Sequence, residues 1–355
     1  MEAANELMEV FSARLRNARK MRCLSYRGLS EAMSGQISPT ALEKYEKGRM
    51  FPSSSAVVML SSALGVRIDD LFRPFSVKID MGDIKYRKRS SIGKKELEAI
   101  NLKVADHLEK YIEVERMCGE NKEFSIVFPE IVVHNEDDAC AVASRFRETF
   151  KMGYAPISSP IEVLESAGAK IVELDDVSEK FDGDNFTTEG AFVIVLNRSF
   201  ISERKRLSLF HETGHKVMSF AEGADEERLC TVFANEVLLP SEVFRKLVGN
   251  KRGDISLEEL KDIQAQYGIS IEAMMVKAMQ AGIISKNRYQ TFCIKVRSDK
   301  EFQKKVRASI YPEENSCRYN RLVFRLLANE EITESKCASL LGCSVQEVRE
   351  RLTLL

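Results

Sequence analysis

The sequence predicts an α+β multidomain protein with an all-helical N-terminal domain, a central α+β domain and a C-terminal helical segment. At 355 residues the chain is longer than most single hydrophobic cores, so two or three domains are expected. Residues 10–72 read as short helices separated by turn signals. Strand-like apolar runs appear later, before the pentapeptide His-Glu-Thr-Gly-His at 211–215. This order predicts a helical domain followed by a domain that contains both helices and strands.

Charge is spread unevenly along the chain, although the formal net charge is only −1. Residues 1–95 hold 18 Lys and Arg against 10 Asp and Glu, a balance of +8 that leaves −9 on the remainder. A basic front on an acidic body is typical of a protein whose N-terminal part meets a polyanion. An ordinary solvated surface can have the same charge balance, so charge alone does not establish that this part binds a polyanion.

Cysteine usage and hydropathy indicate a cytoplasmic protein. The eight cysteines form no Cys-x-x-Cys pair and no tight framework, so they read as reduced, mostly buried thiols. No apolar run approaches the roughly 20 residues that cross a bilayer. The first residues also lack the basic start of an export signal. We therefore expect no membrane partner.

The N-terminal helices carry recognisable start and stop signals. Ser25 is a candidate N-cap, and residues 34–36 form a turn after the helix that Ser25 opens. Ser38 is expected to cap the next helix, with Pro39 at its first position, where the missing N–H of proline does no harm. That helix should stop at Gly48.

Two short helices joined by a tight turn fit a helix-turn-helix, whose second helix enters the major groove of DNA N-terminus first. The candidate DNA contacts are polar residues at the start of that helix, facing base edges, and basic residues near phosphates. They are Gln36, Ser38, Pro39, Thr40, Lys44, Lys47 and Arg49. Such proteins usually dimerise on palindromic sites, so we expect a homodimer on double-stranded operator DNA. Other small helical bundles share the generic pattern.

The details of this region resemble the XRE (Cro/repressor-like) family over about 60 residues. The resemblance rests on the run from Met33 to Gly48, which ends in Lys-Tyr-Glu-Lys-Gly, on Pro52, and on the later Leu64-Gly65-Val66. It implies an XRE-type DNA-binding domain. The turn is about two residues longer than the commonest version, a departure that bears on the base-contacting positions.

A basic linker and a long helix are expected after this domain. The cluster Lys-Tyr-Arg-Lys-Arg-Ser-Ser at 85–91 either holds DNA phosphates or forms a solvated linker, and both readings stay open. A helix from about Gly93 to Met117 follows it. Because this helix is amphipathic, it should pack on a neighbouring element or on the dimer mate.

The central part of the chain mixes helices with strands. Residues 136–150 and 161–168 read as helices, the second with a glycine stop. Residues 170–174 and 190–196 are strand-like, the latter a β-rich run that ends at Asn197.

The pentapeptide at 211–215 predicts a catalytic metal site. His211 and His215 are four residues apart, so on a helix they share one face and can bind one ion. Glu212 then lies beside the open position of the ion, where it can take a proton from a bound water. The chain has only four histidines, which makes a chance match rare. The alternative is a coincidental pair on a solvated helix face.

A tetrahedral catalytic zinc needs a third protein ligand. No third histidine follows at the metzincin distance, so a gluzincin-like carboxylate on a later helix is expected, within residues 225–240. Glu227 shares a helix face with Cys230 and Ala234, which would point it toward the packed side. Glu226 is a near neighbour and stays open as the alternative.

These motifs resemble the ImmA/IrrE family of zincin-like metallopeptidases. The resemblance rests on the strand ending in Asn197, the helix from Arg206 to His215, and the run from Glu227 to Pro240. It implies a Zn²⁺ site, with Mn²⁺ as the alternative ion. By position, it assigns metal binding to His211, His215 and Glu227 and the role of general base to Glu212.

The sequence departs from the family pattern at Cys230, where alanine is usual, and at Thr231, where asparagine is common. A thiol near the site leaves the identity of the metal and its redox sensitivity open. The neighbouring strand at 193–196 is expected to align an extended substrate by edge pairing.

The C-terminal part is expected to be helical. Residues 267–285 read as helix with Met274, Met275 and Met279 in its interior, where methionine is more often core than functional surface. Residues 318–355 should form two or three helices. Within them, residues 332–348 resemble a second helix-turn-helix without basic residues on its reading face, which favours a packing or partner-binding role.

The chain as a whole resembles regulators in which an XRE domain is fused to an ImmA/IrrE peptidase. The expected layout is an XRE domain at 1–75, a linker and helix at 76–120, a metallopeptidase domain at 121–285 and a C-terminal helical domain at 286–355.

The resemblance implies a bacterial or phage-type transcription factor whose zinc-dependent endopeptidase cleaves a repressor, itself or an associated protein. Toxin–antitoxin and mobile-element modules contain such proteins, and the substrate could be a co-encoded repressor or toxin. The competing hypothesis is a non-catalytic repressor or antitoxin whose metallopeptidase-like domain only senses a ligand or partner.

Overall fold

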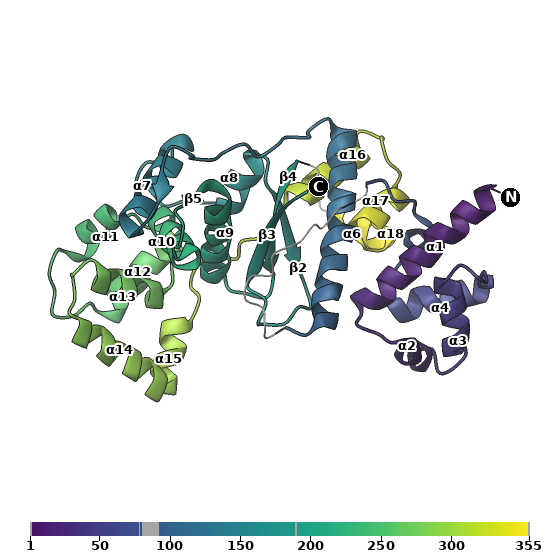
Figure 1. Ribbon diagram of the computed structural model, residues 1–355, viewed down its shortest axis with the longest axis horizontal. Helices are drawn as coiled ribbons and strands as arrows, with labels where there is room; N and C mark the ends of the chain where they lie inside the picture. Colours follow the sequence, from purple (N-terminus) through teal and green to yellow (C-terminus); the bar gives the residue numbers. More distant parts are fainter. Residues whose placement is uncertain (1, 78, 80–91, 189, 354–355) are drawn as a thin grey trace. The chain divides into compact units, whose positions relative to one another are not determined.

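The computed structural model describes residues 2–77, 79, 92–188 and 190–353 (Figure 1). The basic cluster at 85–91 lies outside the described residues. Contacts divide the chain into two compact units. Unit 1 combines residues 1–122 with residues 317–355, and unit 2 comprises residues 123–316, so unit 2 is inserted into the chain of unit 1. None of the described helices is long and apolar enough to span a membrane.

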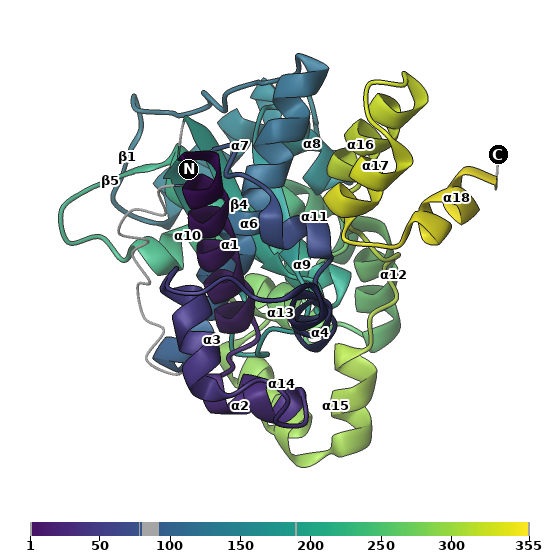
Figure 2. The same cartoon turned by 90° about the vertical axis from the view of Figure 1, so that its right-hand side faces the viewer.

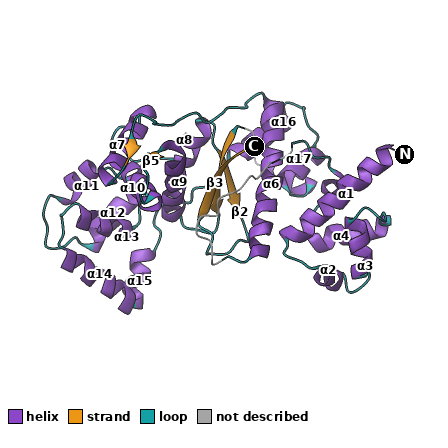
Figure 3. Cartoon of the chain, viewed as in Figure 1, coloured by secondary structure: helices purple, strands orange, loops and turns teal. Residues whose placement is uncertain are grey.

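Unit 1 is helical throughout its described residues (Figure 3). Its helices are α1 (Glu2–Met21), α2 (Tyr26–Ala32), α3 (Pro39–Glu46), α4 (Ser54–Leu64), α5 (Ile68–Phe72), α6 (Lys94–Cys118), α16 (Arg318–Ala328), α17 (Glu334–Leu341) and α18 (Val345–Thr353).

The capping signals of the sequence are confirmed. The Ser25 and Ser38 hydroxyls accept hydrogen bonds from backbone N–H groups at the starts of α2 and α3, and Pro39 opens α3. The chain leaves α3 through Gly48, whose φ of 63° favours glycine. Two short helices separated by a turn therefore stand where the helix-turn-helix was predicted.

Glu46, within the Lys-Tyr-Glu-Lys-Gly run, joins α3 to α1 inside this bundle. Its carboxylate is buried and accepts hydrogen bonds from Nε and Nη2 of Arg19 at 2.6 and 2.8 Å. The Tyr26 hydroxyl donates a further bond at 3.0 Å. A buried carboxylate with three donors is well compensated, so Glu46 fixes α3 against α1.

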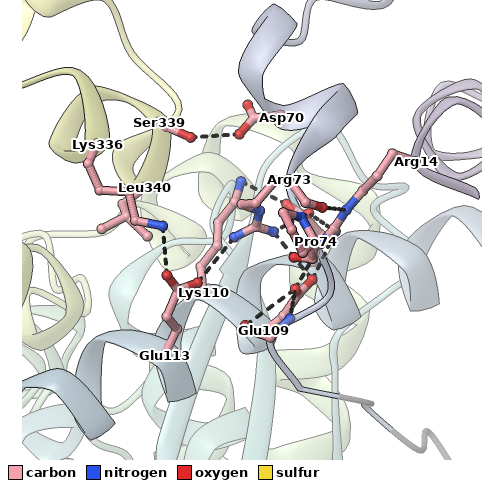
Figure 4. A network of polar contacts seen from close by, with 12 residues as sticks. Arg14, Asp70, Arg73, Pro74, Glu109, Lys110, Glu113, Lys336, Ser339 and Leu340 are labelled. Carbon is pink, nitrogen blue, oxygen red and sulfur yellow. Dashed lines mark hydrogen bonds and ion pairs between the residues drawn. The ribbon is translucent and has the colours of Figure 1, made fainter. Parts of the chain in front are cut away.

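A buried polar network ties the N-terminal bundle to α6 (Figure 4). Arg14 on α1 donates two hydrogen bonds of 2.8 Å to Glu109 on α6, and both side chains are buried. Arg73 contributes a second cation at 3.3 Å from Glu109. Glu113, one turn further along α6, forms an ion pair of 2.6 Å with Lys336 on α17.

The C-terminal helices α16–α18 pack on α6 and so belong to unit 1 (Figures 1 and 2). Tyr111 and Val114 of α6 share one apolar cluster with Val323 of α16 and Cys337 of α17. The segment 286–355, predicted as one C-terminal domain, is thus divided between the two units at residue 317. The physical reason is that its two halves bury their apolar faces in different cores.

Unit 2 contains the described strands. They are β1 (Val132–Val133), β2 (Lys170–Leu174), β3 (Gly183–Thr188), β4 (Ala191–Asn197) and β5 (Ser219–Phe220). Its helices are α7 (Glu136–Thr149), α8 (Pro160–Ser166), α9 (Ser202–Val217), α10 (Glu226–Leu238), α11 (Ser241–Val248), α12 (Leu257–Tyr267), α13 (Ile271–Gln280), α14 (Lys286–Ser298) and α15 (Lys300–Arg307).

The larger sheet has the strand order β2-β4-β3. β4 pairs in parallel with β2 and antiparallel with β3, so both of its edges are occupied. The expectation that residues 193–196 would bind a substrate by edge pairing is therefore wrong. β3 is an edge strand of this sheet and lies against α9. The sequence did not predict this strand, because its polar residues show little strand character.

Two apolar cores build unit 2. The first surrounds α7, α9, α10 and the sheet, and the second lies among α11–α15. Met274 and Met275 are completely buried in the second core, and Met279 packs against it, which confirms their predicted structural role. Within the predicted helical segment 267–285, α13 covers Ile271–Gln280, because Gly268, whose φ is 60°, ends the preceding helix α12.

Candidate metal centre

Helices α9 and α10 lie side by side and carry the candidate metal ligands. Gly214 makes their close approach possible, because a Cβ there would lie 3.1 Å from the Phe233 ring and 3.2 Å from Cys230 Sγ. A side chain at this position would force these neighbouring side chains to shift. The glycine of the His-Glu-Thr-Gly-His run is thus a packing requirement of the site.

The structure brings His211, His215 and Glu227 together, with one candidate ligand atom of each within 4.8 Å of the others. Nε2 of His211 lies 3.4 Å from Oε2 of Glu227, and Nε2 of His215 lies 3.7 Å from Oε1. Two imidazole nitrogens and one carboxylate are a ligand set that suits zinc. The three side chains are only partly buried, so a water or substrate can reach the centre.

Of the two acidic candidates on α10, Glu227 is the one in this cluster. Asp225 caps the helix by accepting a hydrogen bond from the Arg228 backbone, which sets where α10 begins. With that start, Glu227 is directed at the two imidazoles, whereas Glu226 is not part of the group.

Thr231, one turn after Glu227, contacts His211 from the side opposite to the cluster. Its Oγ1 donates a hydrogen bond to the Glu227 carbonyl at 2.9 Å and lies 3.2 Å from His211 Nδ1. Since the single hydroxyl proton is already used, the hydroxyl must accept the Nδ1 proton. That tautomer leaves the lone pair on Nε2, which faces Glu227. Burial also lowers the pKa of His211, against the opposing effect of Glu227, and so favours the neutral imidazole.

Glu212 points toward the edge strand β3. The Asn185 side-chain amide on β3 donates a hydrogen bond of 2.6 Å to Glu212 Oε2. Gly183, two residues earlier, faces the same way, and a Cβ there would lie 3.7 Å from Glu212 Cγ. Sequence analysis missed Asn185 because an asparagine in a polar run carries no motif; only the pairing of β3 with β4 places it.

Cys230 belongs to the buried core beside the site. Its side chain is completely buried, and burial raises the pKa of the thiol far above its usual value. A protonated, enclosed thiol is a poor nucleophile and a poor ligand. The burial of Cys230 therefore gives no support to redox sensitivity of the site.

The opposite face of α9 is held by buried charges. Arg206 is buried and donates hydrogen bonds to the Ile157 carbonyl at 2.7 Å and to Glu314 at 3.0 Å. A Cβ on Gly268 would lie only 2.5 Å from Arg206 Nε, so this turn must be glycine. Lys205 is also buried and lies 3.1 Å from Glu173 on β2. These contacts fix the rotation of α9 and thus the direction of its histidines.

The candidate DNA contacts lie on the surface of unit 1. All seven are exposed: Gln36, Ser38, Pro39, Thr40, Lys44, Lys47 and Arg49. The Ser38 hydroxyl is used as the α3 cap, and Lys47 forms an exposed pair with Glu43. Their exposure is compatible with the predicted role.

Comparison with known proteins concerns the central part of the chain. A search of curated proteins gives no match. Residues 164–279 match the family model described as the IrrE N-terminal-like domain, a family of zinc metallopeptidases. The matched range contains β2–β4, α9 and α10, and hence the whole histidine and glutamate cluster. Residues 164–279 are therefore similar to the IrrE N-terminal-like domain, which supports a regulator of metallopeptidase type.

Proposed function

We propose that this chain is a DNA-binding transcriptional regulator whose unit 2 is a zinc-dependent endopeptidase. The observation that carries the proposal is the convergence of His211, His215 and Glu227, with Glu212 beside them and an edge strand alongside. These three residues would hold Zn²⁺, or Mn²⁺ as the alternative. When bound, the ion would act as a Lewis acid toward water and a peptide carbonyl.

The residues of the chain supply the proton transfers. Glu212 would accept a proton from the attacking water as the water oxygen bonds to the carbonyl carbon. It would deliver that proton to the amide nitrogen as the C–N bond breaks. Asn185 would keep the Glu212 carboxylate directed at the reacting groups through its 2.6 Å hydrogen bond.

The substrate would bind as an extended segment along β3. β3 is an edge strand of the described sheet, and its alternate residues 183, 185 and 187 face α9. An extended polypeptide on this edge would pass over Glu212. The proposed substrate is a repressor, the chain itself or a co-encoded partner protein.

The test uses the purified full chain, loaded with zinc or manganese and incubated alone and with proteins encoded beside it. We expect defined fragments from the wild type, none from Glu212→Gln, and unchanged metal content in that variant. Glu226→Gln is the matched control and should cleave normally. Identical fragment patterns for wild type and Glu212→Gln with every candidate would leave the non-catalytic sensor as the better account.

The proposed DNA-binding role rests on the exposed start of α3. A duplex selected from a random library by the wild-type chain should lose affinity for Thr40→Ala and Lys44→Ala, by about 1–3 kcal/mol for a base contact. Lys151→Ala, an exposed lysine of unit 2, is the control. Unchanged affinity in both α3 variants would reject this recognition helix. A homodimer would protect two half-sites about one helical turn apart.

A further inference from the structure

Two consecutive helices of unit 2 carry a local excess of positive charge. α14 and α15 pack against each other, and we call residues 286–307 the basic hairpin (Figure 1). It holds eight Lys and Arg against two Asp and Glu, a net charge of +6. The other residues of unit 2 carry a net charge of −13. The hairpin also lies beyond residue 279, where the match to the peptidase family ends.

Most of these cations are exposed and unneutralised. Two of the eight are paired: Arg288 with Asp254 at 2.6 Å, and Arg307 with Glu272 at 3.2 Å. Within the described residues, no ion pair joins a carboxylate to the other six, and all six are exposed. These are Lys286, Lys295, Arg297, Lys300, Lys304 and Lys305. Asp299, between the helices, caps α15 by accepting a hydrogen bond from the Phe302 backbone.

The apolar side chains of the hairpin face inward. Phe292, Val296 and Val306 are buried in the core shared with α13, and Lys295 covers the ring of Phe302 at 4.3 Å. Ile294 is the one large hydrophobic residue of the hairpin that is strongly exposed. Centres of protein–protein interfaces are apolar and depleted of lysine. The outer surface of the hairpin therefore fits a polyanion better than a protein partner.

We propose that the basic hairpin binds the phosphate backbone of double-stranded DNA without reading its sequence. Lysine ammonium groups on flexible stems suit phosphates, which need charge and not a fixed hydrogen-bond geometry. α15 is about 12 Å long, and duplex DNA carries one charge per about 1.7 Å, so several phosphates lie within reach of the hairpin. The remaining surface of unit 2 is acidic and repelled by DNA, which makes the hairpin its point of approach.

This contact would add to the one made by unit 1. Because both units belong to one chain, binding by one raises the effective concentration of the other at the DNA. The peptidase unit would then be held near the DNA on which the regulator acts. The proposal depends neither on metal binding nor on the recognition helix, since its test uses DNA without an operator.

The experiment measures binding of the full chain to a fluorescein-labelled 30-base-pair duplex of arbitrary sequence, by anisotropy between 50 and 300 mM KCl. Lys304→Gln/Lys305→Gln removes two charges from the hairpin. Lys151→Gln/Lys261→Gln removes two charges elsewhere in unit 2 and serves as the control. Lys304→Arg/Lys305→Arg keeps the charge and should behave as wild type.

Each phosphate contact contributes about 0.9 to the slope of log K against log salt concentration. We expect the Lys304→Gln/Lys305→Gln variant to lose about 1.8 from that slope and the control to lose none. Equal slopes in the wild type, hairpin variant and control would overturn the proposal and favour an acidic protein as the partner. Lys151, Lys304 and Lys305 are exposed and Lys261 is partly exposed, and unchanged thermal unfolding would confirm that each variant is folded.

Discussion

Asn185 on β3 donates a hydrogen bond of 2.6 Å from its side-chain amide to Oε2 of Glu212 on α9. This contact joins the edge strand, where a substrate would bind, to the residue that would move the proton. The contact depends on the antiparallel pairing of β3 with β4, which places Asn185 opposite Ile194. The Glu212 carboxylate is therefore oriented by a side chain from a strand outside its own helix.

Replacing Asn185 tests this orientation. Asn185→Leu should lower kcat for peptide cleavage by about 10- to 100-fold, since a hydrogen bond to a charged group contributes about 1.5–3 kcal/mol. KM and metal content should change little, because Asn185 is not among the clustered ligands. Thr187→Val is the control on the same strand, since Thr187 contacts Lys216 and not Glu212. An unchanged kcat would assign Asn185 a purely structural role.

Thr231 is expected to set the metal affinity through His211. Thr231→Val removes the acceptor for the Nδ1 proton and should weaken zinc binding about 10- to 100-fold. Thr231→Ser keeps the hydroxyl and should restore wild-type affinity. Competition with a chromophoric chelator measures both values without any need for peptidase activity. Equal zinc affinity in the valine and serine variants would contradict the tautomer argument.

The buried network of unit 1 makes a prediction about stability. Glu109→Ala leaves Arg14 and Arg73 without their shared carboxylate and should lower the free energy of unfolding by about 3–5 kcal/mol. Glu98, which pairs with Lys20 at the surface, is the control, and Glu98→Ala should cost less than about 1 kcal/mol. Urea denaturation followed by circular dichroism measures both. Similar losses of unfolding free energy in the two variants would mean that burial of the network does not contribute to stability.

A pH effect is expected at the capping box of α12. Hydrogen bonds from Ser256 and Arg252 lower the pKa of Glu259 to about 2. A lowered pKa stabilises the folded state above the unfolded pKa of about 4.5, and this contribution is lost as the pH falls toward 2. Glu259→Gln should therefore lower the urea midpoint at pH 7 and have little effect near pH 2. A difference that does not shrink with acidification would contradict this assignment.

Local patterns of the sequence were sufficient to predict several helices, including the one that carries the two histidines. Ser25 and Ser38 cap α2 and α3 as their positions in the sequence indicate, because a cap depends on residues only three positions apart. Likewise, His211 and His215 share a face because four residues make about one helical turn. These features follow from local geometry and needed no knowledge of the rest of the chain.

The choice between Glu226 and Glu227 required the packed structure. Both lie in the first turn of α10, and only the contact of that helix with α9 through Gly214 decides which carboxylate meets the imidazoles. The role of Asn185 could not be predicted either, because β3 is largely polar and shows no clear hydrophobic alternation.

Local patterns were sufficient to predict the capped helices α2 and α3 and the pair of histidines on α9, because these features depend on neighbours within one or two turns. Long-range packing placed β4 between β2 and β3, left β3 as an edge strand, and brought residues 317–353 onto α6. Those outcomes depend on which apolar faces find each other across more than a hundred residues, for instance Tyr111 with Tyr319. No local pattern carries that information.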